Sequence, residues 1–288
     1  MNKKTIILSI FVGILTVNIL SQNSEKLEIG ISGAAGLSAL TVSPIDDVKP
    51  SFGVGYNFGW DVAFKLNPQL SFRTGINLAS FKSSISFDRL DVQFILPPPA
   101  GIPEDYDFYM HAEYDKYEEL FEAFFVRLPL MFQFQTGAEK QFYIAAGFLV
   151  GIPVNSFSQI KTDQLVTKGY SDFTMLEYEN MPSHGFDTQL DIKSASKLEF
   201  GVSISAAIET GIKWKFNNGI NLYTGIYADF GLNNIRKSDD LQEAVIYNNE
   251  NQSFTFNSIL HSQTEGRAMA DKVAPVAFGV KIRFAVKR

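Results

Sequence analysis

Residues 209–230, ETGIKWKFNNGINLYTGIYADF, consist of two alternating runs on either side of a tight turn. Every second residue from 200 to 216, and again from 220 to 232, is apolar or threonine, and the residues between them are polar, charged or small. Period-2 alternation places the two sets on opposite faces of a sheet. Strands in globular proteins usually run about 5–6 residues, and these are more than twice as long. Asn217-Asn218-Gly219 provides the positive-φ residues of a tight hairpin, so the stretch predicts one long, two-faced hairpin.

The same alternation recurs along the whole chain. It predicts eight strands, an even number, at residues 27–37, 52–66, 69–78, 123–135, 142–152, 199–216, 220–232 and 276–284. Short connections at 67–68, 136–140 and 217–219 alternate with long ones at 38–51, 88–118, 156–197 and 234–272. Short turns at one end and long loops at the other are typical of outer-membrane barrels, in which the short turns are periplasmic.

The size of the apolar face decides which way it points. An eight-stranded barrel has an interior only wide enough for side chains or one small ligand, and several dozen bulky apolar residues would overfill it. We therefore expect the apolar face to meet lipid, where closure of the sheet also satisfies every backbone group. The predicted fold is all-β: an eight-stranded antiparallel up-and-down transmembrane β-barrel with short periplasmic turns and long extracellular loops. A soluble lipocalin-like barrel is the weaker alternative.

Aromatic residues gather near the short-turn end of the predicted strands. They would form a periplasmic girdle at the membrane interface, and they are Phe64, Phe72, Phe132, Phe134, Phe142, Trp214, Phe216 and Phe284.

The chain ends and the composition indicate export. Lys3-Lys4, an apolar stretch to Leu20 and the small residue Ser21 have the layout of a secretory signal peptide. A membrane anchor is disfavoured because it needs about 20 apolar residues. We expect a signal peptide at 1–21 and one barrel domain at 22–288. The chain has no cysteine, which excludes disulfides and thiolate metal sites, and its net charge of −6 argues against nucleic acid as a partner.

Three segments carry a family resemblance: GVGYNFGWDVAFKLNPQLSFRTGINL at 53–78, VRLPLMFQF at 126–134 and the closing FGVKIRFAVKR at 278–288. Together with the predicted signal peptide, they make the chain resemble the small outer-membrane β-barrel family of Gram-negative bacteria, PorT-like and OmpX-like. The resemblance implies an integral protein of the cell outer membrane and, from the PorT-like members, an accessory role linked to protein secretion. The chain departs from the best-known barrels because four residues follow its last aromatic, Phe284.

Charged residues of both signs lie on the face predicted to line the lumen. Because buried charges must be paired in a low-dielectric interior, we expect a salt-bridged plug rather than an ion path. A narrow ion or small-molecule channel remains the alternative, whereas a wide porin needs about 16–18 strands. The predicted lumen network comprises Asp61, Lys65, Arg73, Arg127, Glu199, Glu209, Lys213, Asp229, Lys281 and Arg283, with Glu28 and Lys215 on the same face.

The sequence does not favour catalysis. Its three histidines, His111, His184 and His261, all fall in predicted loops. Asp187 near His184, with Asp191 beyond, is a combination able in principle to activate a water, and solvated loop residues are the alternative reading. The sequence contains no glycine-rich phosphate loop, histidine-rich cluster or EF-hand spacing. We therefore expect a non-enzymatic protein with no cofactor and no metal site.

The second predicted loop is the most distinctive segment. Residues 88–122 contain ten acidic and two basic residues, a balance of −8, with tyrosines interleaved among them. Exposed aromatics beside charges are typical of contact surfaces, so we predict a partner-binding or divalent-cation site there, with a solvated cap as the alternative. Its candidate residues are Asp105, Tyr106, Asp107, Tyr109, Tyr114, Asp115 and Tyr117. The expected partners are outer-membrane lipid and a secretion or envelope protein, bound by a monomer; a surface ligand-binding or adhesion role is a further alternative.

Overall fold

The structure is a computed structural model. It describes residues 27–43, 51–96, 101, 103, 105–136, 140–216, 219–237, 241–248, 250–264 and 266–287. The expected signal peptide at 1–21 and the first two residues of the 217–219 turn lie outside this range. Among the described residues, no helix is long and apolar enough to cross a membrane.

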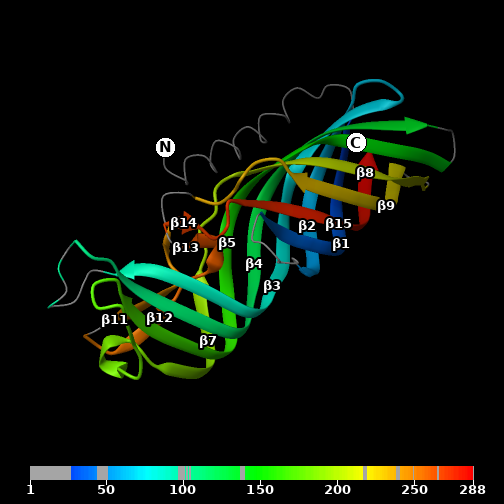
Figure 1. Cartoon of the computed structure of the whole chain (residues 1–288). Coiled ribbons are helices and arrows are strands. Elements are labelled where there is room, and N and C mark those ends of the chain that lie inside the picture. Colours follow the sequence, from blue (N-terminus) through cyan, green and yellow to red (C-terminus); the bar gives the residue numbers. More distant parts are fainter. Residues whose placement is uncertain are drawn as a thin grey trace.

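Eight long antiparallel strands form a closed ring (Figure 1). They are β1 (Leu27–Ser43), β2 (Ser51–Lys65), β3 (Leu70–Leu96), β4 (Phe108–Thr136), β5 (Lys140–Ser171), β8 (Ser203–Lys215), β9 (Ile220–Gly231) and β15 (Lys272–Lys287). Each pairs with the next in this order, and β15 pairs with β1 to close the ring. The predicted eight-stranded up-and-down barrel is confirmed, and closure leaves no open sheet edge in this part of the molecule.

The first and last described residues and the short turns lie at the same end of the barrel. Glu28 pairs with Lys287, and Leu27 pairs with Phe64, next to the turn between β2 and β3. In that turn the Asn67 side chain accepts hydrogen bonds from the backbone of Gln69 and Leu70, at 2.9 and 2.8 Å. The long strand extensions are therefore at the opposite end, which corresponds to the extracellular side of an outer-membrane barrel.

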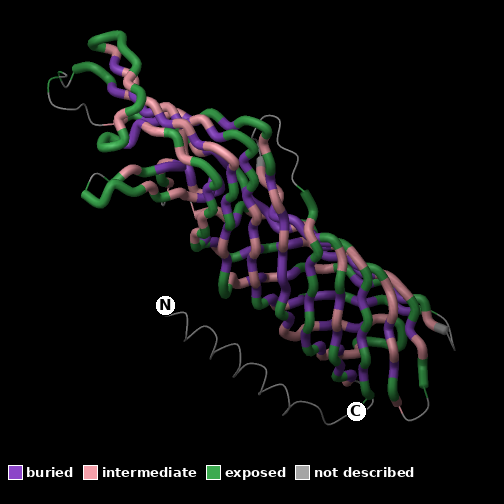
Figure 2. The backbone as a smooth tube through the Cα atoms, turned by 90° about the horizontal axis from the view of Figure 1, so that it is seen from below, coloured by how far each residue is buried: buried purple, intermediate pink, exposed green. Residues whose placement is uncertain are grey.

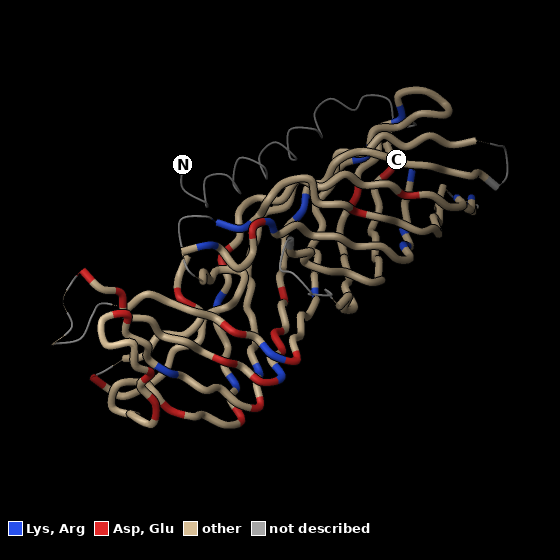
Figure 3. Tube along the Cα trace, viewed as in Figure 1, with Lys and Arg blue, Asp and Glu red and all other residues tan. Residues whose placement is uncertain are grey.

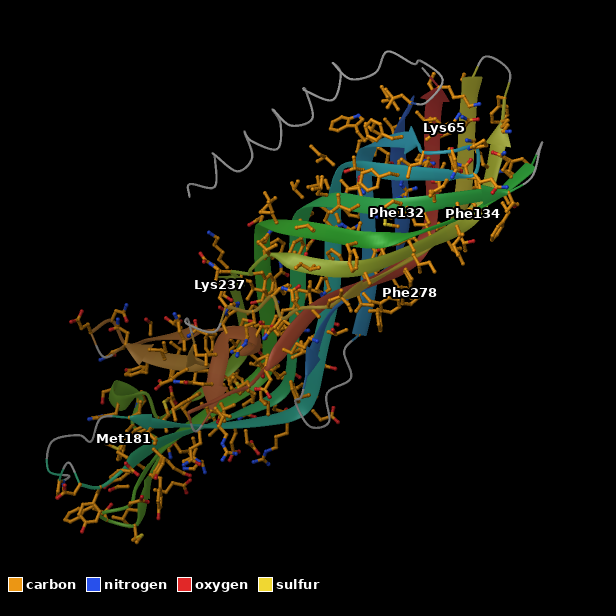
Figure 4. All side chains as sticks on the ribbon, turned by 90° about the horizontal axis from the view of Figure 1, so that it is seen from above. Lys65, Phe132, Phe134, Met181, Lys237 and Phe278 are labelled. Atoms are coloured by element: carbon orange, nitrogen blue, oxygen red, sulfur yellow. The ribbon has the colours of Figure 1, made fainter. Side chains whose placement is uncertain are left out.

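Alternation between exposed and buried residues runs along the barrel strands (Figure 2). The exposed positions are apolar, as at Trp60 and Val280, each 61% exposed, while their neighbours Asp61 and Lys281 are buried inside. Phe132, Phe134 and Phe278, labelled in Figure 4, lie on this outward face. The apolar face of the barrel therefore points outward, as predicted for contact with lipid.

Three strands continue far beyond the barrel. β3, β4 and β5 are 27, 29 and 32 residues long. The loops predicted at 88–118 and 156–197 are therefore wrong over much of their length. The reason is that the alternation continues in these segments with polarity reversed relative to the barrel. Inward positions become apolar, as at Phe81 and Phe121, and outward positions become charged, as at Lys82 and Glu122.

Short elements complete this extension. They are β6 (Leu176–Tyr178), η2 (Pro182–His184), β7 (Thr188–Lys197), β10 (Gln242–Glu243), β11 (Val245–Asn248), β12 (Ser253–Phe256), η5 (Ile259–His261), β13 (Ser262–Thr264) and β14 (Arg267–Ala268). Most of the apolar core of the molecule lies here, where inward residues of β3 and β4, such as Ile85 and Phe121, share one buried cluster with Ile259 and Leu260 of η5. We call residues 81–123, 156–200 and 235–273 the projecting domain.

Candidate functional site

Ion pairs cross the barrel interior between strands that are distant in the sequence. Eight of the ten residues predicted for the lumen network are buried there; the other two are Lys65 and Glu199. Arg73 and Lys281 both contact Glu209, the second at 2.5 Å. The remaining pairs are Arg127–Asp229 and Lys213–Glu28, each at 2.8 Å.

Neutral side chains join these pairs into a network. Gln133 accepts hydrogen bonds from Arg283 and Arg73, at 3.0 and 3.4 Å. The Tyr223 hydroxyl donates to Glu28 at 2.6 Å, and its ring lies 3.7 Å from the Arg283 guanidinium carbon. The roles of Gln133 and Tyr223 were not predicted, although both occupy inward positions of the alternation and an aromatic face can bind a cation.

The two remaining lumen candidates are not buried inside the barrel. Lys65 is half-buried at the short-turn end, beside a recess of about 80 Å³ that Lys213, Lys215 and Lys287 also line (Figure 4). The prediction for Glu199 is wrong: it precedes β8, its side chain is 54% exposed, and it pairs with Lys237 at 2.6 Å. The cause is a break in the alternation, because the neighbouring Phe200 turns inward and bridges to Arg236 before β8 begins.

The residues of the candidate contact surface also fall into two groups, one exposed and one buried. Asp105, Tyr106, Asp107 and Asp115 are exposed, and Tyr109 is half-buried on the outer face of β4. Tyr114 and Tyr117, each 2% exposed, belong to the apolar core instead, so the prediction of a contact role for them is wrong. Both occupy inward positions of β4, where burial and the nearby Glu119 carboxyl raise the pKa of each hydroxyl.

The outer face of the projecting domain carries a broad, open recess of about 580 Å³. Tyr109 of β4 and Tyr170 of β5 are register partners on this face, with ring centroids 6.4 Å apart. The Tyr109 hydroxyl donates to Asp107 at 3.0 Å, and this hydrogen bond raises the pKa of Tyr109 to about 12. The recess is lined by Gln93, Tyr109, His111, Tyr170, Asp172, Met175 and Glu177.

Acidic residues concentrate on the projecting domain (Figure 3). Residues 88–122 carry a net charge of −8 against −6 for the whole chain, which leaves +2 for the remainder. The projecting domain is therefore the acidic part of the molecule, unlike the outer face of the barrel.

One of the three histidines is placed differently from the prediction, whereas His184 and His261 lie outside the strands, in the short helices η2 and η5. His111 lies in β4 and not in a loop, because β4 begins at Phe108. His184 ends the short helix η2 and contacts the Ser183 hydroxyl at 3.0 Å, whereas Asp187 accepts a hydrogen bond from Gln189 at 3.2 Å. His184 and Asp187 are therefore each hydrogen-bonded to a different residue.

Glu119 is a buried carboxyl that the sequence analysis did not single out. It is fully buried, and one of its oxygens accepts hydrogen bonds from the Tyr117 hydroxyl at 2.7 Å and the Ile259 backbone at 3.1 Å. Burial raises its pKa, and these hydrogen bonds oppose the shift. Glu119 thereby links β4 to η5, which covers the core of the projecting domain.

A family model described as "Outer membrane protein beta-barrel domain" matches residues 20–237. No curated protein matches the chain. Among solved structures, the chain is similar to neisserial surface protein A (10% identity, 90% of this chain and 97% of that chain, TM-score 0.32). It is also similar to the Yersinia pestis attachment invasion locus protein Ail (9%, 90% and 99%, 0.30) and to outer membrane protein AlkL (9%, 92% and 92%, 0.35). These similarities concern the fold alone.

Proposed function

Because the chain belongs to the outer membrane protein beta-barrel domain family, we propose that it is a non-enzymatic accessory protein of the outer membrane that binds a partner through its projecting domain. The barrel would serve as the anchor, with its interior closed by the ion-pair network. The expected partner is an envelope or secretion protein, as the PorT-like resemblance implies.

The observation that carries this proposal is an exposed apolar cluster at the far end of the projecting domain. Ile95, Tyr106, Phe173, Met175 and Leu176 are between 43% and 72% exposed; we call them the distal patch. The rings of Tyr106 and Phe173 pack against each other at 4.9 Å. Ile95 lies 17 residues beyond the outward-facing Leu78 on β3, or roughly 55 Å along the strand.

That separation distinguishes the distal patch from the apolar face of the barrel. Lipid covers the barrel face, whereas the distal patch stands in water among acidic residues. Aromatic and methionine side chains are enriched in protein interfaces, and exposed apolar patches commonly mark interaction sites. The patch therefore supports protein binding over a purely structural role.

The interior of the barrel supports a plug over a channel. Four buried ion pairs cross the lumen. Because they leave few buried charges unpaired, their side chains form a rigid plug in the barrel interior. Steady conductance of the purified protein in planar bilayers would instead support the channel alternative.

The test is affinity purification from cross-linked native outer membranes, with a tag placed after Arg288. Three forms would be compared: the unaltered chain, a Phe173→Ser/Met175→Ser variant of the distal patch, and a Leu190→Ser control that alters an exposed apolar residue on β7. We expect proteins captured by the unaltered chain and the control to be lost with the patch variant. Recovery of secretion-machine subunits would identify the role as secretion. Recovery of only lipid and the protein itself would overturn the proposal.

A further inference from the structure

One row of side chains crosses four strands on the outer face of the projecting domain. Ile95 of β3, Tyr109 of β4, Tyr170 of β5 and Glu177 of β6 are successive register partners. Neighbouring strands lie about 4.8 Å apart, so these four side chains stand next to one another on the same face of the sheet. Because Ile95 belongs to the distal patch, the row connects that patch with the recess of about 580 Å³ that Tyr109 and Tyr170 line.

Aromatic rings line this recess. The Tyr109 and Tyr170 ring planes are inclined by 33°, and the ring of His111 stands at 82° to that of Tyr170, with centroids 6.3 Å apart. The Tyr170 hydroxyl contacts the sulfur of Met175 at 3.3 Å, which places this residue of the distal patch at the border of the recess. A partner that covers the distal patch would therefore also reach the rings.

Two aspartates lie at the Tyr109 end of the recess. The Tyr109 hydroxyl donates a hydrogen bond to the Asp107 carboxylate at 3.0 Å. The backbone N–H of Asp172 donates to the backbone oxygen of Asp107 at 3.2 Å, so the two aspartates are held together where β4 and β5 end. Negative charge therefore stands beside the Tyr109 ring.

Two glutamates lie at the Tyr170 end. Glu177 and Glu179 share one cation, the Lys168 ammonium, at 3.4 and 2.5 Å. Together with Asp107 and Asp172, these are four carboxylates with one lysine, which gives the surroundings of the rings a net charge of −3 with histidine counted as neutral. The electrostatics of the recess therefore favour a positively charged ligand.

The lumen of the same protein shows what a tyrosine bonded to a carboxylate can bind. There the Tyr223 hydroxyl donates to Glu28, and the Arg283 guanidinium lies over the Tyr223 ring at 3.7 Å. Tyr109 and Asp107 repeat this hydrogen bond in the recess. Within the described part of the chain, however, no lysine or arginine lies over the Tyr109 ring. A cation from another molecule would complete the arrangement.

The chemistry of the recess favours an organic cation over a metal ion. Among the described residues, no group of three histidine, cysteine, aspartate or glutamate side chains could hold a metal. A guanidinium group is planar, stacks on aromatic faces and bonds carboxylates with two parallel hydrogen bonds, and it is more weakly hydrated than an ammonium group. Arginine is therefore the side chain that best matches two tyrosine rings bordered by carboxylates.

We propose that the recess binds an arginine side chain of the partner protein, with the guanidinium over the rings of Tyr109 and Tyr170 and the neighbouring carboxylates as acceptors. This inference rests on the proposed function and gives its partner a chemistry. The partner surface would present apolar residues to the distal patch and arginine to the recess beside it.

The first test measures the binding of labelled peptides to the purified full chain in neutral detergent at about 0.15 M salt, where long-range attraction is screened. Fluorescence anisotropy would compare hexa-arginine, hexalysine and the uncharged hexacitrulline. We expect hexa-arginine to bind more tightly than hexalysine, and hexacitrulline not to bind. Absence of hexa-arginine binding, or equal binding of hexacitrulline, would overturn the proposal.

Two pairs of variants separate the rings from general attraction to an acidic surface. Tyr109→Leu/Tyr170→Leu keeps every carboxylate and should weaken hexa-arginine binding about tenfold, whereas Tyr109→Phe/Tyr170→Phe keeps the rings and should bind normally. Equal affinity of the leucine variant and the unaltered chain would contradict the role of the rings.

The second pair of variants removes charge and also tests the site if the leucine variant does not fold. Asp172→Asn/Glu177→Gln should weaken hexa-arginine binding. Asp115→Asn/Glu118→Gln removes two exposed carboxylates from β4, about 20 Å or more along the strand from Tyr109, and should leave the affinity unchanged. The same loss in both variants would show that the peptide responds only to overall charge.

Capture from cross-linked outer membranes distinguishes this inference from the proposed function. We expect Tyr109→Leu/Tyr170→Leu to lose the proteins that the distal-patch variant loses. Proteins that are lost with the distal-patch variant but retained by the leucine variant would refute the arginine inference alone. Hexa-arginine binding without any captured protein would instead refute the proposed function.

Discussion

The barrel and the projecting domain use the same strands with opposite polarity. Along β3, inward residues change from Arg73 and Asn77 in the barrel to Phe81 and Ile85 in the projecting domain, without a change of face. Outward residues change correspondingly, from Phe72 to Lys82. The backbone is continuous, so the surrounding medium explains the difference: lipid favours an apolar exterior, and water favours an apolar core.

Much of the apolar core of the projecting domain therefore lies in segments for which the sequence predicted loops. A segment with apolar residues inward and charged residues outward resembles an ordinary half-buried soluble sheet. It should therefore follow the energetics of a soluble domain, while the barrel follows those of a membrane protein.

The largest expected effect comes from truncating the core of the projecting domain. Phe121 is fully buried there, and Phe121→Ala should destabilise this domain by about 3–5 kcal/mol. Hydrogen exchange resolved along β4 should show faster exchange on the Phe121 side and unchanged exchange in the barrel part. Phe132→Ala, on the outward face of the barrel, is the matched control. Equal acceleration along all of β4 would show that the two regions do not open separately.

A charge placed on each outer surface compares the two media directly. Val280 is outward and apolar in the barrel, so Val280→Lys should cost about 2–4 kcal/mol in liposomes if it lies near the bilayer midplane. Glu118→Lys, at an exposed position of the projecting domain, should change stability by less than about 0.5 kcal/mol. Urea unfolding in liposomes measures both. Similar costs for the two variants would contradict the assignment of Val280 to a surface that faces lipid and of Glu118 to a surface that faces water.

The smallest expected effect is a pH dependence confined to the projecting domain. The pKa of Glu119 is raised by burial, so the folded domain holds a proton that an unfolded chain releases at the ordinary glutamate pKa. This contribution to stability is complete below the unfolded pKa and is lost as the pH rises through the raised folded value. The slope is at most about 1.4 kcal/mol per pH unit for one proton.

Limited proteolysis of the projecting domain across this pH range measures the dependence. Glu119→Gln should be cleaved at a rate that changes less with pH, because it remains neutral and buried. Glu122→Gln, at a position only partly buried on the same strand, should retain the dependence of the unaltered chain. If the unaltered chain and Glu119→Gln respond identically, Glu119 does not control the docking of η5.

Much of the barrel could be predicted because its alternation is local. The tight turn after Phe216 and the apolar residues at every second position indicate strand number, the outward face and antiparallel order. Placement of Arg73, Arg127 and Glu209 inside followed from the same periodicity. Their pairing did not, because Arg73 and Glu209 are 136 residues apart and strand register alone brings them together.

The amino-acid sequence by itself determined the eight strands, the apolar exterior of the barrel and the polar character of its lumen, because side chains alternate across a strand with a period of two. Only the tertiary structure decided that β3, β4 and β5 continue into a second, soluble-like region, that Glu199 lies outside the barrel, and that Tyr114 and Tyr117 are buried. These features depend on which segments cover each face of the sheet. The segment that covers the core above β4 is η5, more than a hundred residues away in the chain.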